Sequence, residues 1–222
     1  MDSKEEQQMQ VMDIIVRSVG KRLPTEKNFA EKLGISRPAV REILKGFEAN
    51  GIISSTKGSG RYVQTPDVSG SIVDGWTVLL KIEPGLLSDL LEVRSTVELG
   101  FLEMAIESLK IKDLMKMRDL VERMKVLASL EENFIDEDKE FHNLLFSRVG
   151  NVLLDQLLRA FWALFERIGD DSVLKSVDLV TSAQIHEKLL QAISSKNLEL
   201  SRKLMEEQFL DIENRLKKIK GR

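Results

Sequence analysis

Cysteine is absent from this sequence of 222 residues, and histidine is scarce, occurring only as His142 and His186. The lack of cysteine excludes a disulfide framework, a thiolate zinc site and a cysteine nucleophile, so any metal ion must bind through His, Asp or Glu. No segment approaches the roughly 20 consecutive apolar residues that a membrane-spanning helix needs. The first ten residues are polar and charged, unlike a signal peptide. We therefore expect a soluble cytoplasmic protein with no membrane partner.

Hydrophobic residues make up 42% of the chain, which is enough for packed cores. Charge is distributed unevenly: residues 1–65 hold 11 Lys and Arg against 8 Asp and Glu, whereas the remainder holds 22 against 28. A mildly basic N-terminal part on an acidic body is typical of a protein with an anionic partner at one end.

Glycine and proline separate the segments that have helical periodicity. In the first 64 residues the pattern predicts three helices and a small β wing, at 4–19, 25–33, 36–50, 52–55 and 61–64. A linker at 65–71 precedes further predicted helices, at 72–82, 86–109, 111–129, 132–149, 152–168, 173–194 and 198–219. The expected fold is mainly α, with an N-terminal winged helix-turn-helix domain at 1–64 and a C-terminal all-α bundle of six or seven helices at 72–222.

The predicted helix at 36–50 has two different faces. Apolar residues recur at the spacing of one buried face: Val40, Ile43, Leu44 and Phe47. Cations stand four residues apart on the opposite side: Arg37, Arg41 and Lys45. Such a helix fits the DNA major groove, where an arginine can donate two hydrogen bonds to guanine, although an ordinary solvated helix face can show the same stripe. Ser36 at the helix N-terminus could hold a phosphate, with Lys27 and the wing-tip residues Lys57 and Gly58 beside it.

Four motifs follow one another in this N-terminal part: LPTE at 23–26, LGISRPAVREIL at 33–44, GII at 51–53 and the wing GSGRYV at 58–63. They occur in the order found in the GntR family of transcription regulators, which the sequence resembles. The resemblance implies that Lys27, Arg37 and Arg41 contact operator DNA and that Lys57 and Gly58 enter the minor groove. Lys27 stands where the family usually has arginine, which would weaken a base contact. Two copies are needed to bind a palindrome, so we expect a homodimer formed through the bundle.

Five polar residues interrupt apolar stripes in the predicted bundle: Arg94, Asp138, His142, His186 and Gln208. Arg94 lies in the stripe formed by Leu87, Leu90, Leu91, Val97 and Phe101. A buried polar group without a partner costs about 1–3 kcal/mol, so these groups should satisfy one another, a metal or a ligand. Singly, each could be a core residue or half of an internal ion pair, but together they favour a site. The planar guanidinium of Arg94 suits the carboxylate of an effector.

The predicted bundle also resembles the FadR branch of the same family, through LEVRSTVE at 91–98, DKEFH at 138–142, Gly150–Asn151 and His186. In metal-binding members, the positions of Asp138, His142 and His186 ligate a divalent ion together with a third histidine. Here that third position is Gln208, and an amide oxygen is a poor replacement for imidazole on zinc or nickel. Asp138, His142 and His186 therefore either hold zinc or nickel with water or effector completing the shell, or form a metal-free site.

We expect a DNA-binding transcription regulator, a repressor controlled by a small carboxylate or sugar acid bound in the bundle. The main alternative is a DNA-binding protein whose bundle only dimerises, with Arg94 and both histidines structural. A metal-dependent hydrolase would also bring Asp and His together, but no nucleophile or general base is evident beyond the candidate ligands, so we do not expect an enzyme.

Overall fold

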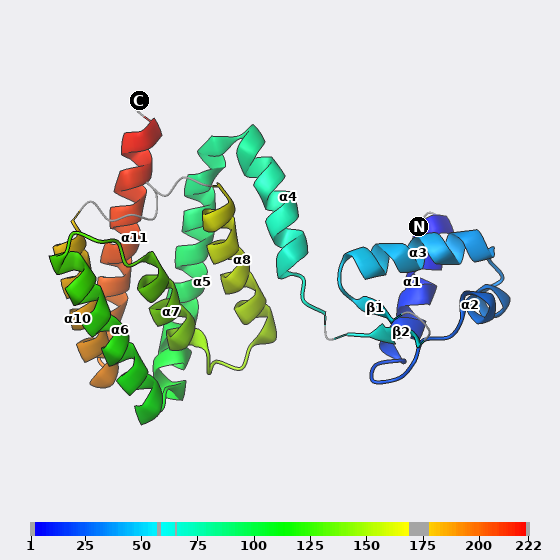
Figure 1. Ribbon diagram of the computed structural model, residues 1–222, viewed down its shortest axis with the longest axis horizontal. Coiled ribbons are helices and arrows are strands. Elements are labelled where there is room, and N and C mark those ends of the chain that lie inside the picture. The colour runs from blue at the N-terminus through cyan, green and yellow to red at the C-terminus, as the bar shows by residue number, and fades with distance from the viewer. Residues whose placement is uncertain (1–2, 57–58, 65, 169–177, 221–222) are drawn as a thin grey trace. The chain divides into compact units, whose positions relative to one another are not determined.

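The computed structural model describes residues 3–56, 59–64, 66–168 and 178–220 (Figure 1). Contacts divide the chain into two compact units, Met1–Ile72 and Val73–Arg222. Within the described ranges no helix is long and apolar enough to cross a membrane. Lys57 and Gly58, at the predicted wing tip, lie outside the described residues.

The first unit contains three helices and a two-stranded sheet: α1 (Ser3–Val16), α2 (Glu26–Leu33), α3 (Arg37–Ala49), β1 (Ile53–Thr56) and β2 (Gly60–Val63). Local capping sets the helix ends. The side chains of Thr25 and Ser36 accept hydrogen bonds from the first turns of α2 and α3. Gly34 ends α2 with a φ of 66°, a left-handed conformation that favours glycine. The two strands pair antiparallel, with Ile53 opposite Val63.

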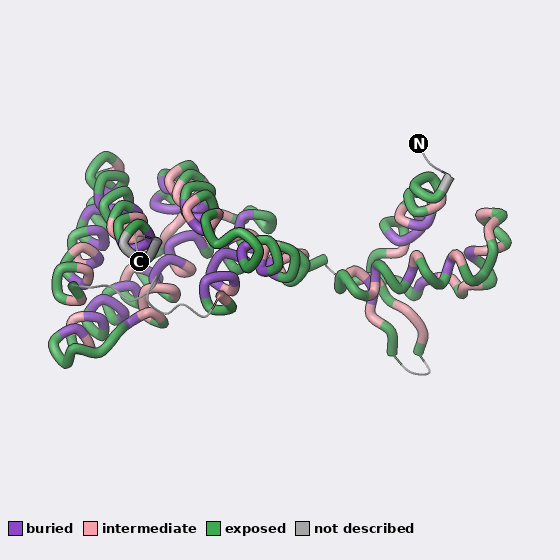
Figure 2. The backbone as a smooth tube through the Cα atoms, turned by 90° about the horizontal axis from the view of Figure 1, so that it is seen from above, coloured by how far each residue is buried: buried purple, intermediate pink, exposed green. Residues whose placement is uncertain are grey.

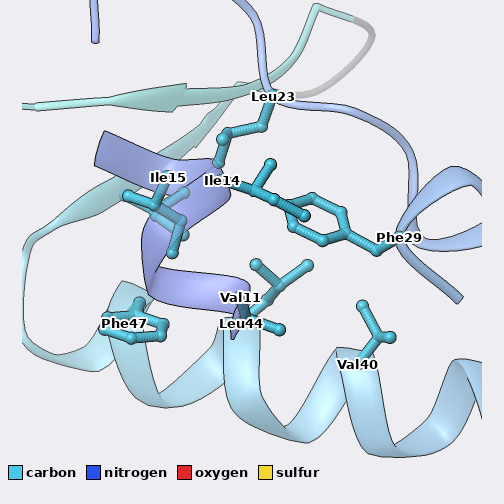
Figure 3. Close-up of a cluster of buried hydrophobic side chains, with 9 residues drawn as sticks. Val11, Ile14, Ile15, Leu23, Phe29, Val40, Leu44 and Phe47 are labelled. Atoms are coloured by element: carbon cyan, nitrogen blue, oxygen red, sulfur yellow. The ribbon is translucent and has the colours of Figure 1, made fainter. Parts of the chain in front are cut away.

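The core of this unit lies between the three helices and the wing. Figure 3 shows Val40, Leu44 and Phe47 pointing from α3 toward α1, where they meet the side chains of Val11 and Ile15. Ile43, predicted in the same apolar stripe, is only partly buried. Because α3 uses one face for this core, its opposite face remains exposed.

The second unit is helical throughout its described part. Its elements are α4 (Ser69–Ile82), which begins in the first unit, η1 (Pro84–Leu86), α5 (Leu87–Ser108), α6 (Ile111–Ser129), α7 (Ile135–Phe146), α8 (Val152–Ile168), α10 (Leu179–Ser194) and α11 (Leu198–Lys220). α6 packs against α7 and α10, and α11 packs against α5 and α10. Buried residues lie on the sides of these helices that face one another (Figure 2). The predicted mainly-α fold, a winged head followed by a helical bundle, is confirmed.

Some predicted boundaries differ from the structure. α4 begins at Ser69, within the segment expected as a linker at 65–71. α7 is shorter at both ends than the helix predicted at 132–149. Glu131, in the turn between α6 and α7, has a positive φ of 59°. The start predicted at residue 173 lies outside the described residues.

The buried face of α5 also differs from the predicted stripe. Val97 and Phe101 are only half-buried, whereas Glu98 and Leu102 are fully buried, each one residue later. The predicted stripe consisted of apolar residues and Arg94, and did not include Glu98. This difference places the carboxylate of Glu98 inside the bundle.

Candidate functional site

A chain of charged side chains crosses the interior of the bundle, with members on α5 (Arg94, Glu98), α7 (Asp138, His142) and α10 (His186). The Arg94 Nε donates to Glu98 Oε1 at 2.7 Å, and the other oxygen of Glu98 lies 3.0 Å from His142 Nδ1. The exposed fractions of Arg94 and Glu98 are only 2% and 0%. Glu98 thus links the guanidinium to the imidazole inside the bundle.

Asp138 lies between the two imidazoles. Its Oδ1 is 2.9 Å from His186 Nε2 and 3.4 Å from His142 Nε2, and ligand atoms from the three residues lie within 4.8 Å of one another. His186 Nδ1 lies 2.9 Å from the carbonyl oxygen of Ser182. A carbonyl only accepts hydrogen bonds, so Nδ1 carries a proton and Nε2 faces Asp138. His186 Nε2 therefore faces the carboxylate of Asp138 at hydrogen-bonding distance.

The charges in this cluster shift its protonation equilibria. Burial alone would lower the pKa of His142, but the charge of Glu98 and hydrogen bonds to Asp138 and Glu98 raise it to about 9. Burial alone would raise the pKa of both carboxyls. The positive charges of Arg94 and His142 outweigh the effect of burial on Glu98. The hydrogen bonds from His142 and His186 outweigh the effect of burial on Asp138. Both carboxyls therefore have pKa values below their usual range. Near neutral pH, a cation entering this cluster would displace the proton of His142.

A cavity of about 140 Å³ opens beside the cluster. The structure brings all five predicted bundle residues, Arg94, Asp138, His142, His186 and Gln208, to its wall, together with Asp211 and Arg215 of α11. Both amide atoms of Gln208 are buried and have no hydrogen-bond partner among the described residues, and the same holds for Arg215 Nη1. These unsatisfied groups in a cavity wall indicate space for a ligand rather than a finished core.

Arg94 has fewer N–H groups available for a ligand than the sequence suggested. Its Nε is used by Glu98, and its guanidinium lies over the ring of Trp162, 4.1 Å from the ring centroid. Only the remaining N–H groups of Arg94 can donate hydrogen bonds to a ligand.

Sequence reasoning missed Glu98 and Arg215. A signal for Glu98 was present, because it stands four residues after Arg94 and the two therefore share a helix face. Arg215 stands seven residues after Gln208, two helical turns along α11, and could have been recognised in the same way.

The donor set fits a divalent metal ion. Two imidazole nitrogens and one carboxylate oxygen are ligands that zinc and nickel accept. The hydrogen bonds of both Nδ1 atoms, to Glu98 and to the Ser182 carbonyl, orient the rings as is usual behind metal-ligating histidines.

In the first unit, the structure leaves the predicted basic face of α3 exposed at Arg37, Arg41 and Lys45. Arg41 is partly engaged, because its Nε and Nη2 donate to one oxygen of Glu26 at 3.0 and 2.8 Å. Ser36 caps α3, so its hydroxyl oxygen already accepts one hydrogen bond. Lys27 is exposed and lies 3.7 Å from Glu31.

Arg61 of the wing, which sequence reasoning did not single out, lies against α2 and α3. It donates to Glu26 at 3.1 Å and to Glu48 at 2.7 Å. The hydrogen bond from Arg41 is the main cause that lowers the pKa of Glu26, with a further contribution from Arg61. Glu26 therefore stays ionised and holds two arginines, one of them on the predicted DNA-facing side.

Comparison with known proteins agrees with this architecture. The family model for bacterial regulatory proteins of the gntR family matches residues 13–63, and the FCD domain model matches residues 89–210. The Uxu operon regulator of Haemophilus influenzae is 29% identical over 197 residues, 86% of this chain and 71% of that protein. The galactonate operon transcriptional repressor of Escherichia coli is 27% identical over 184 residues, 78% of each chain.

A solved structure described as Streptococcus agalactiae GntR superposes with a TM-score of 0.61 and 24% identity, covering 96% of this chain and 99% of that one. This likeness supports the fold. The FCD match alone spans more than half of the chain, and the gntR match covers most of the winged head. The chain belongs to the GntR family of bacterial regulatory proteins, with a C-terminal FCD domain, and is a transcription regulator rather than an enzyme.

Proposed function

We propose that this regulator represses an operon by binding a palindromic operator as a homodimer, and that a small carboxylate bound beside a divalent metal in the bundle releases the DNA. The observation that carries the effector part is the cluster of Asp138, His142 and His186 on the wall of a cavity with unsatisfied polar groups. The alternative, a bundle that only dimerises, does not account for a cavity lined by these residues.

For the DNA, Arg37 and Lys45 are exposed on α3 and Arg41 can exchange Glu26 for guanine O6 and N7 in the major groove. Ser36 and Lys27 at the helix starts contact phosphates, which position the head. Lys57 and Gly58, outside the described residues, are assigned to the minor groove by the family resemblance alone.

In the bundle, Asp138, His142 and His186 would hold zinc or nickel. The cavity wall contains three aspartates (Asp138, Asp178, Asp211) and two arginines (Arg94, Arg215), together with both histidines. A bound divalent ion would add positive charge at Asp138 and would offer a coordination position to a carboxylate. Arg94 binds the same carboxylate through the N–H groups that Glu98 leaves.

One relative supports a carboxylate as the effector, because it is named as a galactonate operon repressor and galactonate carries a carboxylate. In this chain the effector would shift the bundle between two states, and helix α4 would carry the change toward the head.

The experiment begins with selection of an operator from a random DNA library on the purified full chain. Metal content is then measured after dialysis against zinc and nickel, and operator affinity is measured with and without sugar acids and short organic acids. Asp138→Ala should lose the metal and the response to acid while keeping operator affinity. Asp136→Ala, an exposed aspartate on the same helix, is the matched control. If wild type and Asp138→Ala hold equally little metal and respond identically, the metal-assisted effector site does not exist.

A further inference from the structure

Helix α11 contributes three buried polar atoms that have no hydrogen-bond partner among the described residues: both amide atoms of Gln208 and Nη1 of Arg215. Neither residue is explained by the cluster of Asp138, His142 and His186. Both line the same cavity as that cluster.

Arg215 is 8% exposed, and its own helix satisfies only part of its guanidinium. Nη2 lies 3.2 Å from Asp211 Oδ2 and Nε lies 3.4 Å from the Asp211 carbonyl oxygen, but Nη1 has no partner in the part of the chain that the structure describes. Burial lowers the pKa of Arg215 even though Asp211 and Asp138 act to raise it. A buried guanidinium with a free N–H on a cavity wall suits an incoming anion.

Gln208 offers neutral hydrogen-bonding groups in the same cavity wall as the cation of Arg215. Its amide has an acceptor and two donors, and neither heavy atom is hydrogen-bonded among the described residues. It can therefore donate to a carboxylate or bond a hydroxyl.

We propose, resting on the function proposed above, that the cavity selects a short dicarboxylate of three or four carbons. One carboxylate occupies the side of Asp138, His142 and His186, and the second pairs with Arg215 Nη1 while Gln208 bonds the same acid. The cavity volume of about 140 Å³ favours a small acid, because a cavity of about 150 Å³ is known to hold benzene, and a dicarboxylate of three or four carbons is closer to benzene in its number of non-hydrogen atoms than a six-carbon sugar acid is. The second carboxylate follows from Arg215, because a monocarboxylate on the side of Asp138, His142 and His186 would leave Arg215 Nη1 without a partner among the described residues.

The test uses the zinc-loaded full chain and isothermal titration with malonate, succinate and malate against acetate and lactate. Wild type should bind the dicarboxylates at least about tenfold more tightly, the size expected for one charged hydrogen bond. Arg215→Met should remove this preference without changing monocarboxylate affinity, and Gln208→Leu should reduce it. Lys217→Met, an exposed cation on the same helix, should keep the wild-type preference.

Two results would overturn the inference: equal affinity of wild type for both acid classes, or an unchanged preference in Arg215→Met. The comparison of dicarboxylate and monocarboxylate affinity in wild type tests the inference even if a variant fails to fold. If monocarboxylates bind and their binding requires zinc and Asp138, but wild type shows no preference for dicarboxylates, this inference is wrong and the proposed effector site stands. Absence of binding by every acid would also remove the proposed effector site.

Discussion

Glu98 is the residue whose removal the structure predicts to be most damaging to the bundle. It is fully buried and pairs with Arg94 at 2.7 Å and with His142 at 3.0 Å. At an effective dielectric of about 20, each pair attracts by about 6 kcal/mol, and desolvation offsets much of this gain. Glu98→Ala leaves two buried cations without their anion, so we expect the free energy of unfolding to fall by about 3–5 kcal/mol.

Urea denaturation followed by tryptophan fluorescence measures this loss directly. Both tryptophans, Trp76 and Trp162, lie in the helical unit, and Trp162 contacts Arg94. Glu103→Ala, at an exposed position on the same helix, should change stability by no more than about 0.5 kcal/mol. Zinc affinity of Glu98→Ala should also fall, by about 10- to 100-fold, because Glu98 orients His142. A loss of stability under about 1 kcal/mol would refute the view that Glu98 compensates two buried charges.

Three further predictions concern separate groups. In the metal-free protein the pKa of His142 is raised to about 9 from its usual value of 6.5, so the stability that protonated His142 contributes is fully present below pH 6.5 and is lost as pH rises through 9. Urea denaturation at a series of pH values should show that the free energy of unfolding of wild type falls by about 3 kcal/mol over this range. His142→Gln should lack this fall, and the same dependence on pH in both proteins would contradict the prediction. Arg41→Ala should weaken operator binding by about 1–3 kcal/mol per half-site in a gel shift with an unchanged circular dichroism spectrum, and unaltered affinity would remove Arg41 from the DNA contacts. Gln208→His should raise zinc affinity in a competition titration, because imidazole is the better ligand, and an unchanged affinity would place Gln208 away from the metal.

The candidate site was only partly predictable from the sequence. Polar residues on apolar stripes identified Arg94, Asp138, His142, His186 and Gln208, and the structure places all of them on one cavity. The pattern could not reveal how they divide their hydrogen bonds, because periodicity gives the face of a helix and not the neighbour that the face meets. Arg94 donates a hydrogen bond to Glu98, a residue that the predicted apolar stripe did not include.

The helical class and the starts of α2 and α3 follow from the sequence, because capping by Thr25 and Ser36 and termination by Gly34 act within a few residues of the chain. The two faces of α3 follow from it as well, since the spacing of the cations and apolar residues is a property of one helix. The sequence could not show the pairing of Glu98 with His142, 44 residues apart, or the absence of a partner for Arg215 Nη1 among the described residues. These depend on which helices pack together, because a buried charge is stable only beside the partner that the packing supplies.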